Sequence, residues 1–205
     1  AICNYLALLG WSPGDDRENV TMKELTELFT VEKVHSSPAR FDMKKLEAIN
    51  GDKIRALTID EFLDWSLPFL TKAGVVSGSA DEIALVKLAL PLIQERIIML
   101  SEVPAMLKFL FVKNFAVEAD SVAKITDDAS KQVLERSLKE LEPLATWTHE
   151  SIEAALRSSL IEEMGLKPRI AFGAVRIATT GSTISPPLFE SMELLGKEAS
   201  LARIR

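Results

Sequence analysis

The sequence predicts an all-α fold made of many short helices joined by turns. Apolar residues recur at spacings of three and four residues, two Thr-x-x-Glu capping boxes mark helix starts, and clusters of glycine and proline separate the helical stretches. Of the 205 residues, 47% are hydrophobic and 26% are charged, which is typical of a globular protein with a sizeable core.

The N-terminal helices begin and end at local signals. Residues 1–10 form an apolar helical pattern that ends at a glycine, and a turn cluster follows over 11–16. Thr21 and Glu24 form the first capping box, in which the hydroxyl and the carboxylate each satisfy a free backbone amide. A short helix should follow this box and end at Phe29.

The next segment contains a break and two helices. Ser-Ser-Pro at 36–38 interrupts the chain, and residues 41–50 are helical by spacing with a glycine directly behind them. Thr58 and Glu61 form the second capping box. Pro68 should kink or end the helix that this box opens.

Four further helices are predicted after a candidate linker at residues 74–79, whose sequence is Gly-Val-Val-Ser-Gly-Ser. A long helix over 80–99 should be interrupted or bent near its proline, and an N-cap with an early proline opens another over 101–112. Two amphipathic helices follow over 128–144 and 148–164.

The C-terminal segment differs from the rest of the chain. Residues 176–181 (Arg-Ile-Ala-Thr-Thr-Gly) form a short apolar, β-capable run, a turn-rich bridge covers 182–187, and a helix is expected over 188–195. An arginine, several hydroxyls and two prolines therefore gather on what should be an exposed, stiff loop. Binding groups are often placed on such loops.

Composition excludes several classes of function. Cys3 is the single cysteine, so an intrachain disulfide is impossible and a reducing compartment is expected. With only His35 and His149, no Cys/His metal site can form, and the acidic pairs at 15–16 and 127–128 suit a turn and a helix start better than a metal site. No nucleotide-binding loop or nucleophile elbow is present, and no apolar run is long enough to span a membrane. These absences favour a binding module.

Charge is uneven along the chain. The net charge of −6 disfavours a uniformly basic nucleic-acid binder but allows a local basic patch. Residues 1–74 sum to −3, residues 75–159 to −4 and residues 160–205 to +1. A polyanion should therefore meet least repulsion at the C-terminal segment.

Three basic or turn positions are candidate binding sites, each with a structural alternative. Arg176 is either structural, capping carbonyls or pairing with a carboxylate, or it presents its planar fork to a base edge or a phosphate. The Ser185–Leu188 turn either starts a helix, with serine as N-cap and proline in the first turn, or supports an unstacked base. Arg96 is either an ordinary exposed arginine on an apolar helix or a base or phosphate contact. From the residues alone, the structural alternative leads at each position.

Aromatic residues are expected in the core rather than at a stacking surface. Tyr5, Trp11, Trp65 and Trp147 each sit in or beside an apolar helical stripe.

Segments at both ends of the chain carry a family resemblance. Residues 4–12 (Asn-Tyr-Leu-Ala-Leu-Leu-Gly-Trp-Ser) resemble the segment that follows the nucleotide-binding signature loop of bacterial glutamyl-tRNA synthetases. Residues 176–181 and 194–198 are similar to the family's extreme C-terminal motif, and 41–46 with Asn50-Gly51 to its short helix before an asparagine–glycine turn. The order and spacing fit over essentially the whole chain, with only a loose match over 77–166. The family's two ATP-handling signatures do not occur.

The resemblance implies the C-terminal part of such a synthetase without its catalytic domain. It implies a stem-contact helical region over 1–75 and two small α-helical anticodon-binding subdomains over 76–145 and 146–205. This part should be catalytically inactive alone and hold no cofactor or metal. The complete enzyme would use ATP and magnesium to attach glutamate to tRNA in the cytoplasm.

The resemblance also implies roles for five residues in binding the glutamate anticodon. Arg96 occupies the place of an arginine that recognises the third anticodon base, and Arg176 aligns with an arginine at the anticodon pocket. Ser185, Pro186 and Leu188 align with the loop that packs on the first two bases; serine stands where some members carry threonine. We expect a monomer whose partner is tRNA and not a membrane or metal. The alternative hypothesis is a helical protein-interaction module that does not bind RNA.

Overall fold

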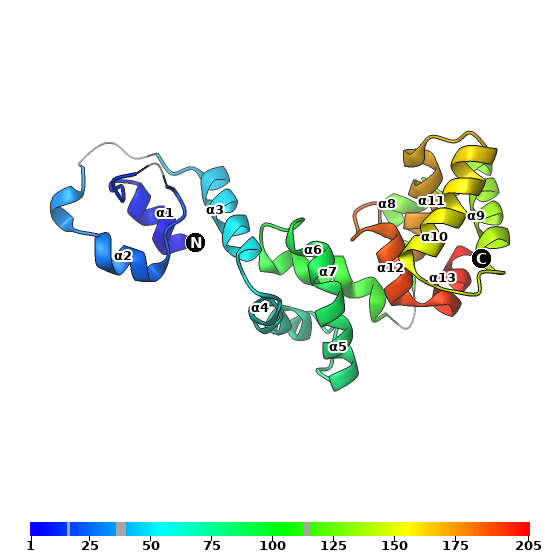
Figure 1. Ribbon diagram of the computed structural model, residues 1–205, viewed down its shortest axis with the longest axis horizontal. Coiled ribbons are helices and arrows are strands. Elements are labelled where there is room, and N and C mark those ends of the chain that lie inside the picture. The colour runs from blue at the N-terminus through cyan, green and yellow to red at the C-terminus, as the bar shows by residue number, and fades with distance from the viewer. Residues whose placement is uncertain (16, 36–39, 113–114) are drawn as a thin grey trace.

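The computed structural model describes residues 1–15, 17–35, 40–112 and 115–205. Within these residues every regular element is a helix, which confirms the all-α prediction, and the helices follow one another along an elongated molecule (Figure 1). In chain order the elements are α1 (Ile2–Leu8), α2 (Met22–Leu28), η1 (Val31–Lys33), α3 (Met43–Arg55), α4 (Ile59–Lys72), α5 (Ala80–Ala89), α6 (Pro91–Gln94), η2 (Leu100–Glu102), α7 (Val103–Leu107), η3 (Lys108–Leu110), α8 (Ala119–Val122), α9 (Asp128–Leu141), α10 (His149–Leu156), η4 (Arg157–Glu163), α11 (Pro168–Thr180), α12 (Leu188–Leu195) and α13 (Lys197–Ile204). The predicted turn residue Asp16 and the predicted break at 36–38 lie outside the described residues.

Three buried clusters follow one another along the chain. Among the described residues, the first is small and consists of Leu25 from α2 with Trp11 and Val20 from the segment between α1 and α2. The second is built by α3 to α7, with members Ile54, Phe62, Leu63, Leu70, Val76, Val86, Ala89, Leu90, Ile93, Ile97, Val103 and Leu107. The third is built by α9 to α13, with members Val133, Leu141, Ile152, Leu156, Leu160, Ala171, Ala174, Val175, Ala178, Leu188, Met192, Leu201 and Ile204. Leu194 of α12 packs against the second cluster and so joins the last two groups of helices. The domain boundaries near residues 75 and 145 stay predictions.

Both predicted capping boxes are present. Thr21 accepts from the Glu24 amide, Thr58 accepts from the Glu61 amide, and each glutamate accepts from the backbone amide of its threonine. Pro68 does not end α4, which continues to Lys72. Of the two predicted effects of Pro68, ending the helix is wrong, because Leu70, fully buried in the second cluster, holds the last turn in place, and a kink stays a prediction.

Asn50 and Gly51 lie inside α3 rather than in the expected turn. Asn50 Nδ2 donates to Ile98 O at 2.5 Å, and a Cβ at position 51 would lie 3.2 Å from Ile98 Cγ2. The pair therefore lets the segment before η2 approach α3 closely, a tertiary role that the local turn signal does not reveal.

The candidate linker at 74–79 is a packed connection between α4 and α5. Val76 is buried, and the Glu82 carboxylate accepts hydrogen bonds from the amides of Ser77, Gly78 and Ser79. Together with the Ser77 hydroxyl, which contributes most, these bonds lower the pKa of Glu82 to about 2.

Several predicted helix boundaries change. The helix expected over 80–99 is interrupted at Leu90, as its proline suggested, but ends at Gln94. The segment 101–112 is divided among η2, α7 and η3, and the helix expected over 148–164 continues from α10 into the wider π-helical turn η4. The final predicted helix is confirmed as α12.

Candidate nucleic-acid interface

Arg176 lies on a helix and not on a β-like run. It belongs to α11, which begins with Pro168 in its first turn and buries one face in the third cluster. The hydroxyls of Thr179 and Thr180 donate to the carbonyls of Val175 and Arg176, so these strand-favouring residues are accommodated in the helix. The β-capable run at 176–181 is helical, as the all-α prediction requires, because burial of the face outweighs local propensity.

The loop after α11 is folded back onto Arg176. Arg176 Nη1 donates to Ser185 Oγ at 2.6 Å and to Pro186 O at 2.7 Å. Ser185, Pro186 and Leu188 are buried, so the expectation of a wholly exposed loop is wrong for them. Only Thr183 and Ile184 are exposed within this turn. The residue at the N-cap of α12 is Pro187, so Ser185 does not cap that helix.

Arg96 approaches the same region from another group of helices. It lies exposed in the turn directly after α6, rather than on a helix as expected, because the helix ends at Gln94. Gln94 Nε2 donates to Ile54 O at 3.0 Å and to Leu57 O at 2.8 Å, which fixes the end of α6 against α3.

A cleft of about 400 Å³, called the smaller cleft below, joins these candidates. Its lining consists of Arg96, Met106, Arg176, Thr183, Ile184 and Ser185. Burial, and after it the positive charge of Arg96, lowers the pKa of Arg176 from its ordinary value. Two guanidinium groups therefore share one partly desolvated site, where an anion or a base edge with acceptor atoms would relieve their repulsion.

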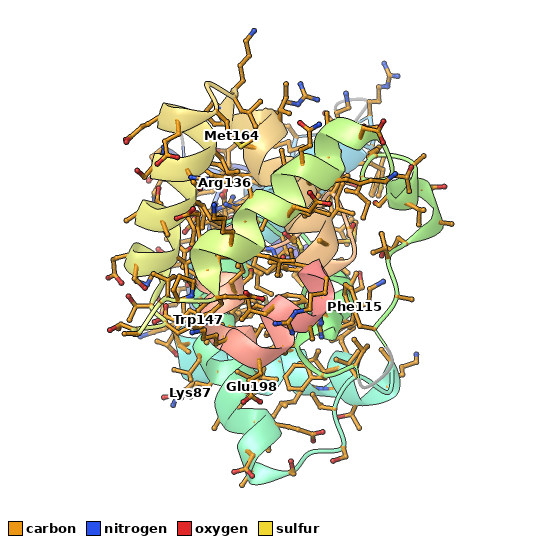
Figure 2. The ribbon with its side chains drawn as sticks, turned by 90° about the vertical axis from the view of Figure 1, so that its right-hand side faces the viewer. Lys87, Phe115, Arg136, Trp147, Met164 and Glu198 are labelled. Carbon is orange, nitrogen blue, oxygen red and sulfur yellow. The ribbon has the colours of Figure 1, made fainter. Side chains whose placement is uncertain are left out.

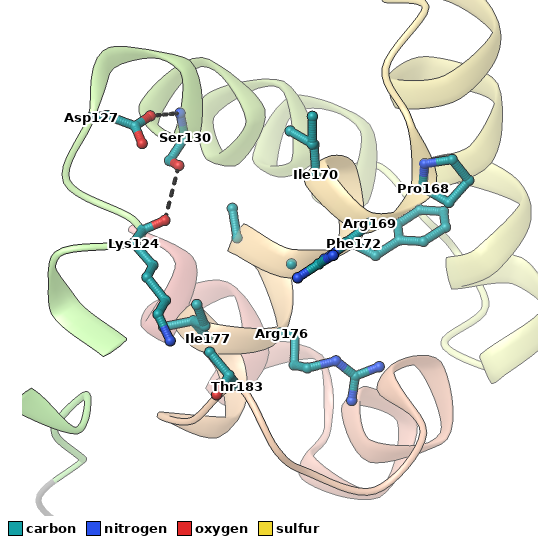
Figure 3. A pocket seen from close by; sticks show the side chains of 12 residues that line it. Lys124, Asp127, Ser130, Pro168, Arg169, Ile170, Phe172, Arg176, Ile177 and Thr183 are labelled. Carbon is teal, nitrogen blue, oxygen red and sulfur yellow. Dashed lines mark hydrogen bonds between the residues drawn. The ribbon is translucent and has the colours of Figure 1, made fainter. Parts of the chain in front are cut away.

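A larger cleft of about 700 Å³ shares Arg176 and Thr183 with the smaller one (Figure 3). Its full lining is Lys124, Asp127, Ser130, Pro168, Arg169, Ile170, Phe172, Gly173, Ala174, Arg176, Ile177 and Thr183. The Asp127 carboxylate accepts from the Ser130 amide at 2.7 Å, and this backbone bond lowers the pKa of Asp127. Three basic side chains thus line this cleft together with one carboxylate that already serves as the N-cap of α9.

The structure brings together four of the five residues predicted at the site. Ser185 and Pro186 accept hydrogen bonds from the Arg176 guanidinium, and Arg96 joins them through the smaller cleft. Leu188 follows the same loop but is buried in the third cluster and lines neither cleft. Sequence reasoning missed Lys124, Arg169, Thr183 and Ile184. The positive sum of residues 160–205 could have pointed to Arg169, but no local signal marks the others.

The prediction that four aromatic residues lie in the core holds for some of them and not for all. Tyr5 and Trp11 are buried, and Trp147 is half-buried with its Nε1 donating to Met192 O at 2.9 Å. The prediction is wrong for Trp65, which is 60% exposed on the outer face of α4.

Within the described ranges, no group of three or more His, Cys, Asp or Glu side chains could hold a metal ion. Among the helices described, none combines the length and apolar composition needed to cross a membrane.

Basic side chains concentrated in joined clefts, on a helical scaffold of net negative charge, define a helical module suited to nucleic acid. The chain belongs to the family described as "Anticodon binding domain", which matches residues 55–205.

Over its whole length the chain is also similar to glutamate–tRNA ligases. The ligase of Saccharopolyspora erythraea is 48% identical over 207 residues, covering 100% of this chain and 41% of that protein. The ligase of a Nocardioides species is 47% identical over 208 residues, covering 42% of that protein. The chain thus spans about two fifths of the length of these relatives, and the predicted family resemblance is confirmed.

A solved structure shares the fold. The glutamate tRNA ligase of Elizabethkingia meningosepticum, determined in complex with its amino acid, superposes with a TM-score of 0.79 at 24% identity. The match covers 99% of this chain and 39% of that one.

Proposed function

We propose that the chain is the anticodon-recognising part of a glutamate–tRNA ligase and binds the unstacked anticodon bases of a tRNA in the smaller cleft. The single observation that carries this proposal is the convergence of Arg96 and Arg176 on that cleft. Single-stranded loops expose base edges and faces, and a guanidinium fork matches paired acceptors on a base.

The five residues would act in two ways. Arg96 and the guanidinium nitrogens of Arg176 that do not hold the loop would bind base edges. Ser185 and Pro186 would hold the Arg176 fork in place through their two hydrogen bonds. Buried Leu188 would anchor the loop in the third cluster and so support the surface on which the bases lie.

The larger cleft would bind the RNA backbone next to the bases. Lys124 and Arg169 line it together with Arg176, and such contacts supply affinity without sequence preference. This arrangement accounts for RNA binding by a chain whose overall charge is negative.

Catalysis would belong to the rest of a longer enzyme. We infer that the whole ligase uses ATP and magnesium in the cytoplasm, and that the 205-residue chain alone does not aminoacylate tRNA. We also infer that the chain is monomeric, with tRNA as its partner.

The test is binding of a fluorescent anticodon stem–loop RNA, measured by anisotropy at low salt. The chain should prefer a glutamate anticodon, and Arg176→Ala should weaken binding by roughly 1–3 kcal/mol, about 5- to 150-fold. Arg17→Ala, which removes an arginine paired with Asp15 and Glu24 near the N-terminus, is the control and should leave affinity unchanged. Equal losses for an unrelated anticodon would limit Arg176 to backbone contact.

A second candidate function is a helical protein-interaction module that does not bind RNA. The observation favouring it is an apolar cleft of about 360 Å³ lined by Ile2, Met43, Leu46, Glu47, Asn50, Phe69, Met99, Leu100 and Ser101. Such a cleft suits the apolar face of a partner helix. Absence of any tRNA-dependent shift at low salt would favour this function over the first.

A further inference from the structure

Arg203 of α13 connects the two groups of helices that meet at the smaller cleft. Its Nη1 donates to Thr179 O and its Nη2 donates to Phe109 O, each at 2.8 Å. The guanidinium carbon lies 4.0 Å from the centre of the Phe115 ring, which Figure 2 shows beside α13. One planar fork therefore holds carbonyls from two distant parts of the chain.

Each of these carbonyls belongs to a residue close in sequence to one that lines the smaller cleft. Thr179 is three residues beyond Arg176 on α11, and Phe109 is three residues beyond Met106. Residues three apart on a helix are neighbours on its surface. The fork thus joins the helix that carries Arg176 to the segment that carries Met106, and these two stretches are called the Arg176 wall and the Met106 wall below.

The wall that carries Met106 also carries Arg96. Ile93 and Ile97 lie on either side of the turn that follows α6 and carries Arg96, and both are buried in the second cluster with Leu107 of α7. The Arg96 turn and the Phe109 carbonyl therefore move with the same packed group.

The backbones come into close contact beside the fork. Gly181 has φ +83°, and a Cβ there would lie 3.1 Å from Ala116 O. Gly181 O accepts from the Glu118 amide at 2.9 Å. A Cβ at this position would be closer than an ordinary contact, so the backbones of the two segments approach each other tightly beside the fork.

We propose that Arg203 is a positioning residue: it sets the spacing between the Arg96 and Arg176 walls, so that both guanidiniums reach one single-stranded RNA. This inference rests on the proposed function. Arg203 itself contacts no base; it acts through the placement of Arg96 relative to Arg176. Packing of Leu194 against the second cluster still joins the groups when the fork is lost, so the spacing changes without separation.

Lys197 provides a matched control on the same helix. Its Nζ donates to Glu142 O at 2.8 Å and to Leu144 O at 2.7 Å, both at the end of α9. Lys197→Met therefore removes a cation and two carbonyl contacts within one group of helices, whereas Arg203→Met removes one carbonyl contact within that group and one to the other group. Arg203→Lys keeps the charge but cannot supply the planar fork.

The first measurement needs no RNA. Nitroxide labels at Glu95→Cys and Ile170→Cys, in a Cys3→Ser background, report the distance between the walls by pulsed electron spin resonance; both positions are exposed. Arg203→Met and Arg203→Lys should broaden or shift the distance distribution, and Lys197→Met should not. Equal distributions in all variants would overturn the positioning role.

The second measurement uses the anticodon stem–loop RNA and the unlabelled chain. Arg203→Met and Arg203→Lys should each raise Kd about tenfold, the equivalent of one lost base contact. Arg96→Gln should then raise Kd less than about twofold in the Arg203→Met background. In the Lys197→Met background it should raise Kd as much as it does in the otherwise unaltered chain. An equal cost of Arg96→Gln in both backgrounds, or wild-type binding by Arg203→Lys, would refute the inference. Failure of the unaltered chain to bind would instead refute the proposed function, with the distances still deciding the role of Arg203.

Discussion

Ser185→Ala isolates the contact that holds the Arg176 fork. The Ser185 side chain is 5% exposed, and its Oγ accepts from Arg176 Nη1 at 2.6 Å. A hydrogen bond to a charged partner contributes about 1.5–3 kcal/mol net. Because Arg176 keeps its hydrogen bond to Pro186 O at 2.7 Å, we expect Ser185→Ala to reduce stability by the lower end of this range, about 1.5 kcal/mol.

Amide hydrogen exchange within α11 and α12 measures this loss where it occurs. RNA affinity should fall as well, by less than with Arg176→Ala, since the guanidinium remains but is no longer held in one orientation. Ser185→Thr keeps the hydroxyl and is the control, with affinity near that of the unaltered chain. Unchanged exchange and unchanged affinity in Ser185→Ala would show that the loop does not depend on this bond.

Three further predictions concern charge, backbone and pH. Replacing both Lys124 and Arg169 by glutamine should make the slope of log affinity against log salt about 1.4 less steep, because each of the two lost phosphate contacts on a single strand contributes about 0.7. Gly181→Ala should destabilise the chain by more than about 1 kcal/mol, because it adds a clash with a carbonyl to the cost of a positive φ. Gly74→Ala shares the positive φ but has open space around it, so thermal melting should show a smaller loss. Since the folded pKa of Glu82 is about 2, below its usual 4.5, its contribution to stability is present above pH 4.5 and declines as the pH falls toward 2. Glu82→Gln should make the melting temperature depend less on pH over that interval.

One control variant and one refuting outcome complete the salt experiment. Lys72→Gln removes an exposed lysine at the end of α4, outside both clefts, and should leave the salt slope unchanged. A slope unchanged by the double glutamine substitution would exclude the larger cleft as a backbone contact.

Local signals predicted much of the helical structure. The capping boxes at Thr21 and Thr58 depend on residues three apart, so the sequence contains all of their geometry. Local signals do not predict the conformation of residues 176–181 or of the Asn50-Gly51 pair, because burial in α11 and contact with Ile98 decide it. Neither contact can be inferred from neighbouring residues.

The candidate site was predictable only in part. Arg96 and Arg176 are far apart in sequence, and family resemblance rather than spacing paired them. The sequence predicts Ser185 and Pro186 on an exposed loop, whereas in the structure they are buried and hold Arg176. Lys124 was missed because the cleft that it lines exists only once α8 to α11 have packed.

The three buried clusters give the chain a built-in set of optical reporters. Trp11 belongs to the first cluster, Trp147 packs against the third, and Trp65 lies on α4, which helps to build the second. Replacing two tryptophans at a time by phenylalanine would leave one emitting residue per region. Because the first cluster has only three buried members, its fluorescence transition should come at the lowest denaturant concentration. A single melting temperature would then average over regions that lose their structure separately.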